Sequence, residues 1–169
     1  VDSLDTTDAQ GNTVIGENAG DSFSGTDAVR NTLIGKDAGT AVTTGDYNTA
    51  VGAYSLDACT TGQNNTSIGD AALSATTTGS YNTGIGNTSL YANTTGGQNT
   101  GLGAQALYSN TTGDNNTGIG MNALYTTSTA DNNTALGKDA LKLATAGYNT
   151  ALGTWALQAS TSAESNVAI

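Results

Sequence analysis

The chain has 169 residues, a formal net charge of −10 and only 11% charged residues, with no His, no Pro and a single Cys. The excess of acidic side chains would repel phosphate backbones, so nucleic acid is not an expected partner. Without His or a Cys pair, the usual zinc sites and activated nucleophiles cannot be built. We therefore expect no enzyme activity, no catalytic residue, no metal and no cofactor, and the absence of a long apolar stretch predicts no membrane insertion.

Residues 1–11 lack the phrase that fills the rest of the chain, and we expect them to form an N-terminal cap or a junction. Residues 12–169 are expected to form one repeat domain, in which each copy begins with Asn-(Thr/Val)-x-(Ile/Val/Leu). Successive copies start 19, then 17 six times, then 16 and finally 17 residues apart. The copies begin at Asn12, Asn31, Asn48, Asn65, Asn82, Asn99, Asn116, Asn133, Asn149 and Asn166.

A short period that is kept from end to end indicates a solenoid, in which each copy is one coil stacked on the previous one. Helical solenoid units need roughly 30 to 45 residues, so 17 residues rich in Thr, Gly and Asn leave room only for short strands and corners. The predicted fold is all-β, a parallel β-solenoid of about ten 17-residue coils. The last copy stops at Ile169, before its corner Gly, and the chain does not start with Met, so we expect it to be part of something longer.

Numbering each copy from its Asn, Gly occupies the fifth position wherever the copy reaches it, and Gly is frequent at the fifteenth position. Both positions are predicted to be corners that need positive φ or a missing side chain. The structural corners of the central copies are Gly52, Gly69, Gly86, Gly103, Gly120 and Gly137.

Alternation along a strand predicts which faces point inward. Positions 2 and 4, such as Thr83 and Ile85, and positions 9 and 11, such as Leu90 and Ala92, are expected to form a thin core beneath a ladder of stacked Asn. Positions 3 and 8 would then point outward, yet they are small throughout the body of the chain, with the larger Val14 and Leu33 only near the start, which favours close contact with identical chains, most simply three around an axis. The alternative is that these residues point into a narrow interior. The predicted self-association face comprises Ala72, Ser89, Ala106, Ala123, Gly84, Gly101 and Gly118.

Aromatic residues supply the candidate ligand contacts. Tyr91, Tyr108 and Tyr125 share position 10 in three consecutive copies, so their rings are expected to form a ladder. Such a ladder, and the single Trp155 at position 7, could stack on sugar rings of a surface glycan; alternatively, the ladder only stiffens the rod.

Two weaker candidates come from other side chains. Asp114 and Asp131 share position 16 in adjacent copies and could hold a cation, although solvated corner acids are the simpler interpretation. The lone Cys59 at position 12 is interpreted as a tolerated small residue rather than a reactive thiol.

The phrase Asn-Thr-Ala-Val-Gly-x-x-Ser-Leu that begins at Asn48, and the closing Ser165-Asn166-Val167-Ala168-Ile169, resemble the head repeats of YadA-type trimeric autotransporter adhesins. The longer form from Asn116 to Tyr125, with the Thr111-Thr112-Gly113 corner, is similar to repeats of phage tail-fibre proteins. The resemblance covers about residues 12–169, although the adhesin repeat is shorter. It implies a left-handed β-roll assembled as a homotrimer.

The expected function is a structural and adhesive module of an extracellular fibre, of the tail-fibre or surface-adhesin type, that forms a rigid rod and contributes to attachment. One alternative is a filament subunit that stacks end to end. Another is an ice-binding solenoid, which usually presents Thr-x-Thr on a flat face, whereas the Thr pairs of this chain, such as Thr60 and Thr61, are adjacent. The expected partners are further copies of the chain and a host-surface glycan.

Overall fold

The computed structural model describes residues 10–23 and 27–169, and the predicted N-terminal cap, residues 1–11, lies almost wholly outside them. All regular structure in the described residues is β-strand, with one short strand directly after each repeat Asn. The strands are β1 (Thr13–Ile15), β2 (Thr32–Ile34), β3 (Thr49–Val51), β4 (Thr66–Ile68), β5 (Thr83–Ile85), β6 (Thr100–Leu102), β7 (Thr117–Ile119), β8 (Thr134–Leu136), β9 (Thr150–Leu152) and β10 (Val167–Ala168).

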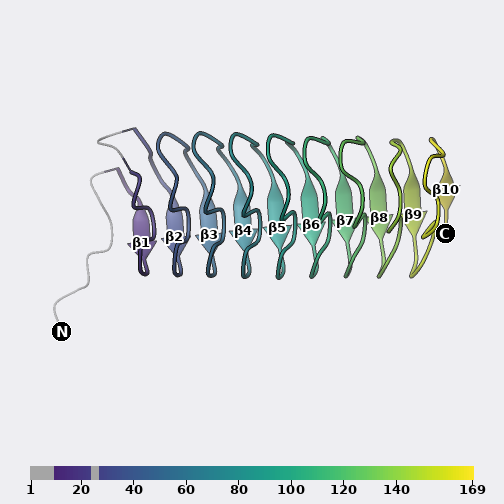
Figure 1. Ribbon diagram of the computed structural model, residues 1–169, viewed down its shortest axis with the longest axis horizontal. Helices are drawn as coiled ribbons and strands as arrows, with labels where there is room; N and C mark the ends of the chain where they lie inside the picture. The colour runs from purple at the N-terminus through teal and green to yellow at the C-terminus, as the bar shows by residue number, and fades with distance from the viewer. Residues whose placement is uncertain (1–9, 24–26) are drawn as a thin grey trace.

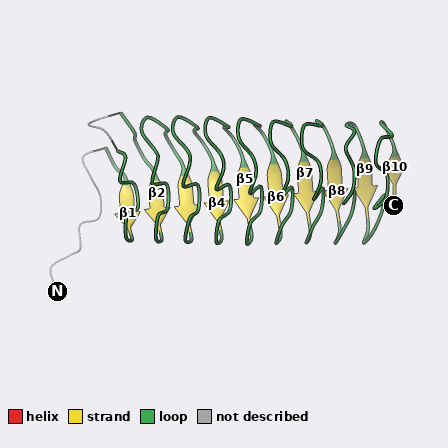
Figure 2. Cartoon of the chain, in the orientation of Figure 1, coloured by secondary structure: helices red, strands yellow, loops and turns green. Residues whose placement is uncertain are grey.

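The strands form one parallel sheet in sequence order, so the coils stack along the long axis of a rod (Figures 1 and 2). The register aligns equivalent positions of successive copies without a shift, and Ile68 pairs with Ile85, which pairs with Leu102. The longer first copy does not disturb this register, because Thr13 still pairs with Thr32. The predicted parallel β-solenoid with a repeat of about 17 residues is confirmed.

Hydrogen bonds also join the coils outside the strands. In the coil that begins at Asn82, the backbone N–H groups of Leu90, Ala92 and Thr94 donate to carbonyl oxygens of the next coil, at 2.9, 3.0 and 2.8 Å. Others point backward, such as the N–H of Gly86, which donates to Ile68 O at 2.8 Å. Each interior coil is therefore bonded to both neighbours around much of its circumference, which pairs backbone groups that short strands alone would leave unpaired.

The repeat Asn forms the predicted buried ladder. The backbone N–H of Asn82 donates to Oδ1 of Asn65 at 3.0 Å, and Nδ2 of Asn82 donates to the carbonyl of Gly96 at 2.9 Å. Oδ1 of Asn82 in turn accepts the backbone N–H of Asn99 at 3.0 Å, so one side chain ties its coil to the next coil and to its own second corner. Because the side chain is fully buried, losing either bond would leave a costly unpaired polar group.

The two corners use Gly for different reasons. At the first corner, Gly86 has a φ of +132°, and a methyl group added there would lie 2.6 Å from the carbonyl oxygen of Gly103. At the second corner, Gly96 needs no positive φ, but an added methyl group would lie 2.5 Å from the carbonyl oxygen of Gly113. At the first corner a side chain is therefore excluded for two reasons, the positive φ and the lack of space.

The assignment of faces made from the sequence is wrong for the strand. Positions 3 and 8 point inward and position 4 points outward: Ala50 and Ser55 are fully buried, whereas Ile68 is 38% exposed. The strand lies so close to the opposite turn that a methyl group on Gly84 would come within 3.1 Å of Leu73 Cγ. The predicted self-association face is therefore interior, with all of its members buried in a single chain: Ala72, Ser89, Ala106, Ala123, Gly84, Gly101 and Gly118.

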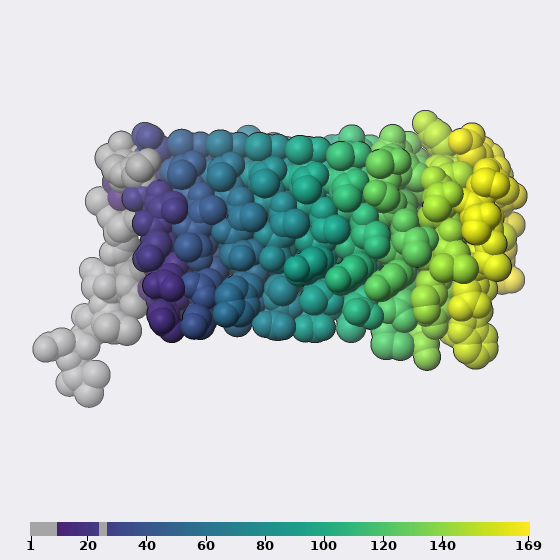
Figure 3. Space-filling view, in the orientation of Figure 1, coloured from purple at the N-terminus to yellow at the C-terminus, as the bar shows by residue number. Residues whose placement is uncertain are grey.

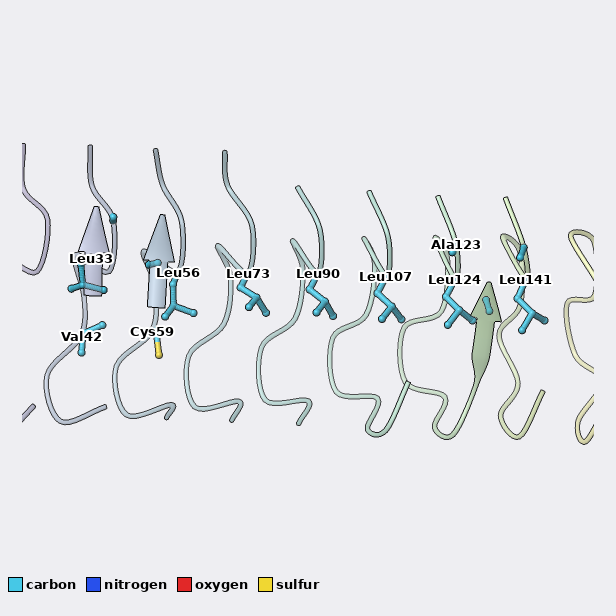
Figure 4. Packing of buried hydrophobic residues seen from close by; sticks show 14 of the residues in the cluster. Leu33, Val42, Leu56, Cys59, Leu73, Leu90, Leu107, Ala123, Leu124 and Leu141 are labelled. Carbon is cyan, nitrogen blue, oxygen red and sulfur yellow. The ribbon is translucent and has the colours of Figure 1, made fainter. Parts of the chain in front are cut away.

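Position 9 supplies the core, as predicted. Its leucines form one buried column along the rod, flanked by the small residues of positions 3 and 8 (Figure 4). Position 11, predicted to be inside, is only half-buried, as at Ala92. The column contains Leu56, Leu73, Leu90, Leu107, Leu124 and Leu141.

Left-handed backbone explains why neighbouring positions 8 and 9 are both buried. Leu73 and Leu90 have φ of 48° and 54°, and Ala71 and Thr88, two residues earlier, are also left-handed. Strand alternation does not apply to such a turn, because each reversal of φ redirects the next side chain.

The core of the first two coils is filled by a different position. Here position 9 is Gly20 or Gly39, and Leu33 at position 3 fills the space that the Leu of position 9 occupies in the other coils. A methyl group on Gly39 would lie 2.7 Å from Leu33 Cδ2. Phe23 and Val14 pack against the same end of the core. The large residue thus moves from the turn to the strand, and the facing position is Gly.

We predict that Gly86→Val lowers the free energy of unfolding by about 3 kcal/mol or more, because Val would be forced into positive φ and against the carbonyl of Gly103. Chemical denaturation measures the change. The control is Gly97→Ser in the same coil, where neighbouring copies carry Ser80 or Asp114. Equal stability of the two variants would contradict the role of the corner.

We predict that Leu107→Ala costs about 2 to 5 kcal/mol, the range for a buried Leu, whereas Leu102→Ala in the same coil costs about 1 kcal/mol or less. Leu107 is fully buried, and Leu102 is 43% exposed. Urea titrations of both variants in dilute solution test whether position 9 lies inside and position 4 outside. If Leu102→Ala were the more damaging variant, the side chain of position 4 would have to lie inside.

Candidate functional site

The three ladder tyrosines stack as predicted. The ring centroids of Tyr91 and Tyr108 are 5.3 Å apart with an interplanar angle of 7°, and those of Tyr108 and Tyr125 are 5.1 Å apart at 6°. Parallel rings at this distance form an offset stack in which each ring covers part of its neighbour. The two faces of Tyr108 are therefore covered in part by the two outer rings. This geometry favours the stiffening role over sugar stacking along the ladder.

Trp155 is separate from the ladder. It lies at position 7 of the coil that begins at Asn149, in a left-handed conformation with φ of 63°, and 60% of its surface is exposed. Its backbone N–H donates to Lys138 O at 3.0 Å. In the described part of the chain no ring contact joins Trp155 to Tyr91, Tyr108 or Tyr125. An open indole face at one place, rather than an aromatic strip, is what the structure offers a ring-shaped ligand.

The two adjacent aspartates act as clamps between coils. Oδ1 of Asp114 accepts the backbone N–H of Gly97 at 2.7 Å, and Oδ1 of Asp131 accepts that of Asp114 at 2.7 Å. Asp46 accepts the N–H of Val29 in the same way at 2.9 Å. Within residues 10–23 and 27–169, no group of three acidic, His or Cys side chains could hold a metal ion. Asp114 and Asp131 are therefore corner residues that join adjacent coils by hydrogen bonds.

Cys59 lies inside the rod, at position 12, and is fully buried. Its thiol donates to the carbonyl of Gly62 at 3.5 Å. Removal from water disfavours the thiolate and raises the pKa of Cys59 to about 11. The side chain is a packing residue in a column that also contains Val42 and Thr76.

The structure reveals a surface that the sequence analysis placed inside. The outward face of the sheet carries two columns, Thr at position 2 and Ile, Val or Leu at position 4, and we call it the Thr-aliphatic face. In the aliphatic column Ile15, Leu102, Leu136 and Leu152 are 42–43% exposed. Ile34, Val51, Ile85 and Ile119 are half-buried.

A signal for this face was present in the sequence. Position 4 is always a large aliphatic residue, whereas position 3 of most copies is Ala, Ser or Gly. The same two columns fit either an interior Ile with a small exterior or the reverse, so the columns alone do not decide between the two arrangements. The second copy, however, has Leu33 at position 3 and Gly39 at position 9, the reverse of the central copies. This exchange of large and small residues indicates that positions 3 and 9 face each other.

The face of the rod seen in Figure 3 is continuous, and the described residues form no pocket. The described part of the chain holds no helix with the length and apolar character of a membrane span. No family model matches the chain, and neither the curated proteins nor the solved structures contain a match. The resemblance to adhesin heads and tail-fibre repeats therefore remains an interpretation of the repeat phrase alone.

We predict that a reagent that labels thiols by disulfide exchange reacts with Cys59 slowly at pH 8 in the folded chain and rapidly and completely in denaturant. The matched control is Thr61→Cys in a Cys59→Ala background, because Thr61 is exposed two residues away. The raised pKa also means that the unfolded thiol ionises above pH 9, whereas the folded thiol ionises only near 11. The contribution of Cys59 to stability should therefore fall between these values. Equal labelling rates of the two cysteines would contradict its burial.

Proposed function

We propose that the chain is the rigid rod of an extracellular fibre, of the tail-fibre or surface-adhesin type, in which copies associate as a homotrimer. The observation that carries this proposal is the unbroken register of the ten strands, with every strand paired to the strand of the next coil. A rod with the spacing of a parallel sheet spans about 45 Å over these coils. Its length is set by the number of copies, which is the property that a spacer needs.

Stiffness follows from how the coils are joined. Each interior coil is held by strand pairing, by turn hydrogen bonds and by the buried Asn ladder, so bending would stretch several bonds at once. The Tyr91, Tyr108 and Tyr125 stack and the Asp114 and Asp131 clamps add contacts between coils on the outside. These features support a load-transmitting element rather than a binding domain with a moving part.

Contact with a surface would use the sides of the rod. No charged residue lies between Ala71 and Gly113, so this stretch presents hydroxyl and amide groups that suit solvated, neutral glycans. Trp155 offers an open ring for such a ligand, and the ladder offers phenol hydroxyl groups. The resemblance of the repeat phrase to adhesin heads and tail fibres supports the extracellular setting.

We predict that duplicating one whole copy, residues 82–98, lengthens the rod by one sheet spacing, about 4.8 Å, and that five added copies lengthen it by about 24 Å. Small-angle X-ray scattering measures the maximum dimension, and circular dichroism and melting temperature report folding. The control inserts the same residues in scrambled order. A particle whose maximum dimension stays constant as copies are added would contradict the spacer function.

A further inference from the structure

We propose that copies of this chain pack on one another through the Thr-aliphatic face. The inference rests on the association proposed above and assigns it to a surface, in place of the small residues now found inside the rod. The face runs along the rod from β1 to β9, so it is a stripe rather than a local patch.

The first step is the amount of apolar surface. The aliphatic column has nine side chains, each with about two-fifths of its surface exposed or somewhat less. Together they expose roughly 500 to 600 Å² of apolar surface. This area is at the upper end of what single-chain proteins expose as one patch. The half-buried Thr column beside it adds methyl groups. Water over such a column is released when a second apolar surface covers it, which is the main source of association free energy.

The second step is size. Together the two columns offer roughly 800 Å², which is about the area that each partner contributes to a standard specific interface. The area is elongated, so a partner must also be elongated and straight to cover it. A second copy of the rod has that shape.

The third step is periodicity. A parallel copy has the same spacing between coils, so aliphatic side chains of the two rods meet at every level without a growing mismatch. An unrelated globular partner would match only a few levels. Identical repeats therefore favour the chain itself as the occupant.

The fourth step is charge. Neither column contains an ionisable side chain, although the chain carries a net charge of −10. The nearest charged side chains along the sequence, two residues beyond the aliphatic column, are sparse: Glu17, Lys36, Asp70 and Lys138. Glu17 and Lys36 are already paired within the chain at 3.5 Å. Closing the two columns themselves thus buries no carboxylate, and the aspartate clamps lie at position 16, on the second corner.

The test measures the oligomeric state by sedimentation equilibrium at 1 to 100 µM, on the order of the affinities expected for a standard interface. The wild-type chain is expected at two or three times its mass of 16.7 kDa, three being the number proposed above. Ile85→Lys/Leu102→Lys should dissociate to the monomer with its circular dichroism spectrum unchanged. The matched control is Thr95→Lys/Thr112→Lys, with the same charges in the same two coils at exposed position 14, and it should stay associated.

Two further variants test the face even if the lysine variant does not fold. Ile85→Thr/Leu102→Thr keeps strand-forming residues and should weaken association at least tenfold. Ile85→Cys in a Cys59→Ala background should form a disulfide between parallel copies, whereas Thr95→Cys should not.

The outcomes separate the claims. An associated wild-type chain whose mass does not respond to changes at Ile85 and Leu102 would overturn the face but not the association. A wild-type monomer at 100 µM would overturn both and leave the rod. If that monomer also retarded the growth of ice crystals, and Ile85→Lys/Leu102→Lys abolished the effect, the occupant of the face would be ice rather than a second copy.

Discussion

The narrow gap between the strand and the turn opposite it is the constraint on which the rest of the structure depends. Only one large side chain fits between the two layers at each level, and the distance from Gly84 to Leu73 leaves no room for a second. Positions 3 and 8 beside that leucine must therefore be small in the central coils, and the polar Asn ladder closes one side. The bulky aliphatic residues of position 4 lie on the other face of the strand, which is why a rod with a thin core carries so much aliphatic surface on its outside.

The period and the Gly corners of the chain were enough to predict the stack of coils, its register and the buried Asn and Leu columns. The side on which Ile85 lies was not predictable in the same way, because alternation along a three-residue strand fixes which residues share a face but not which face is inside. Leu73 and Ala72 escaped the rule for another reason: left-handed residues in the turn bury two neighbours in succession. The Tyr ladder was predictable as a stack, but the covered faces of Tyr108 were not.

The proposed function follows from repetition rather than from a single site. The described coils form no pocket that could concentrate reactive groups; Asp114 and Asp131 accept hydrogen bonds between coils, and the Cys59 thiol is buried. What repetition does provide is length, stiffness and a uniform stripe along the sheet. The proposed fibre and the proposed contact between copies use these three properties and require no special residue.

The exchange of Leu33 with Gly39 also bears on how such a chain changes over generations. Leu33 occupies space beside Gly20 of the coil before it, so this second coil tolerates only a predecessor that lacks a leucine at the ninth position. The central coils carry no such requirement, because a small residue faces the leucine of each predecessor. Unequal recombination can therefore add or delete genetic copies in the centre of the gene, whereas a misplaced copy of the second coil would create a steric clash. The start of the array should be inherited as a fixed block, and length should vary behind it.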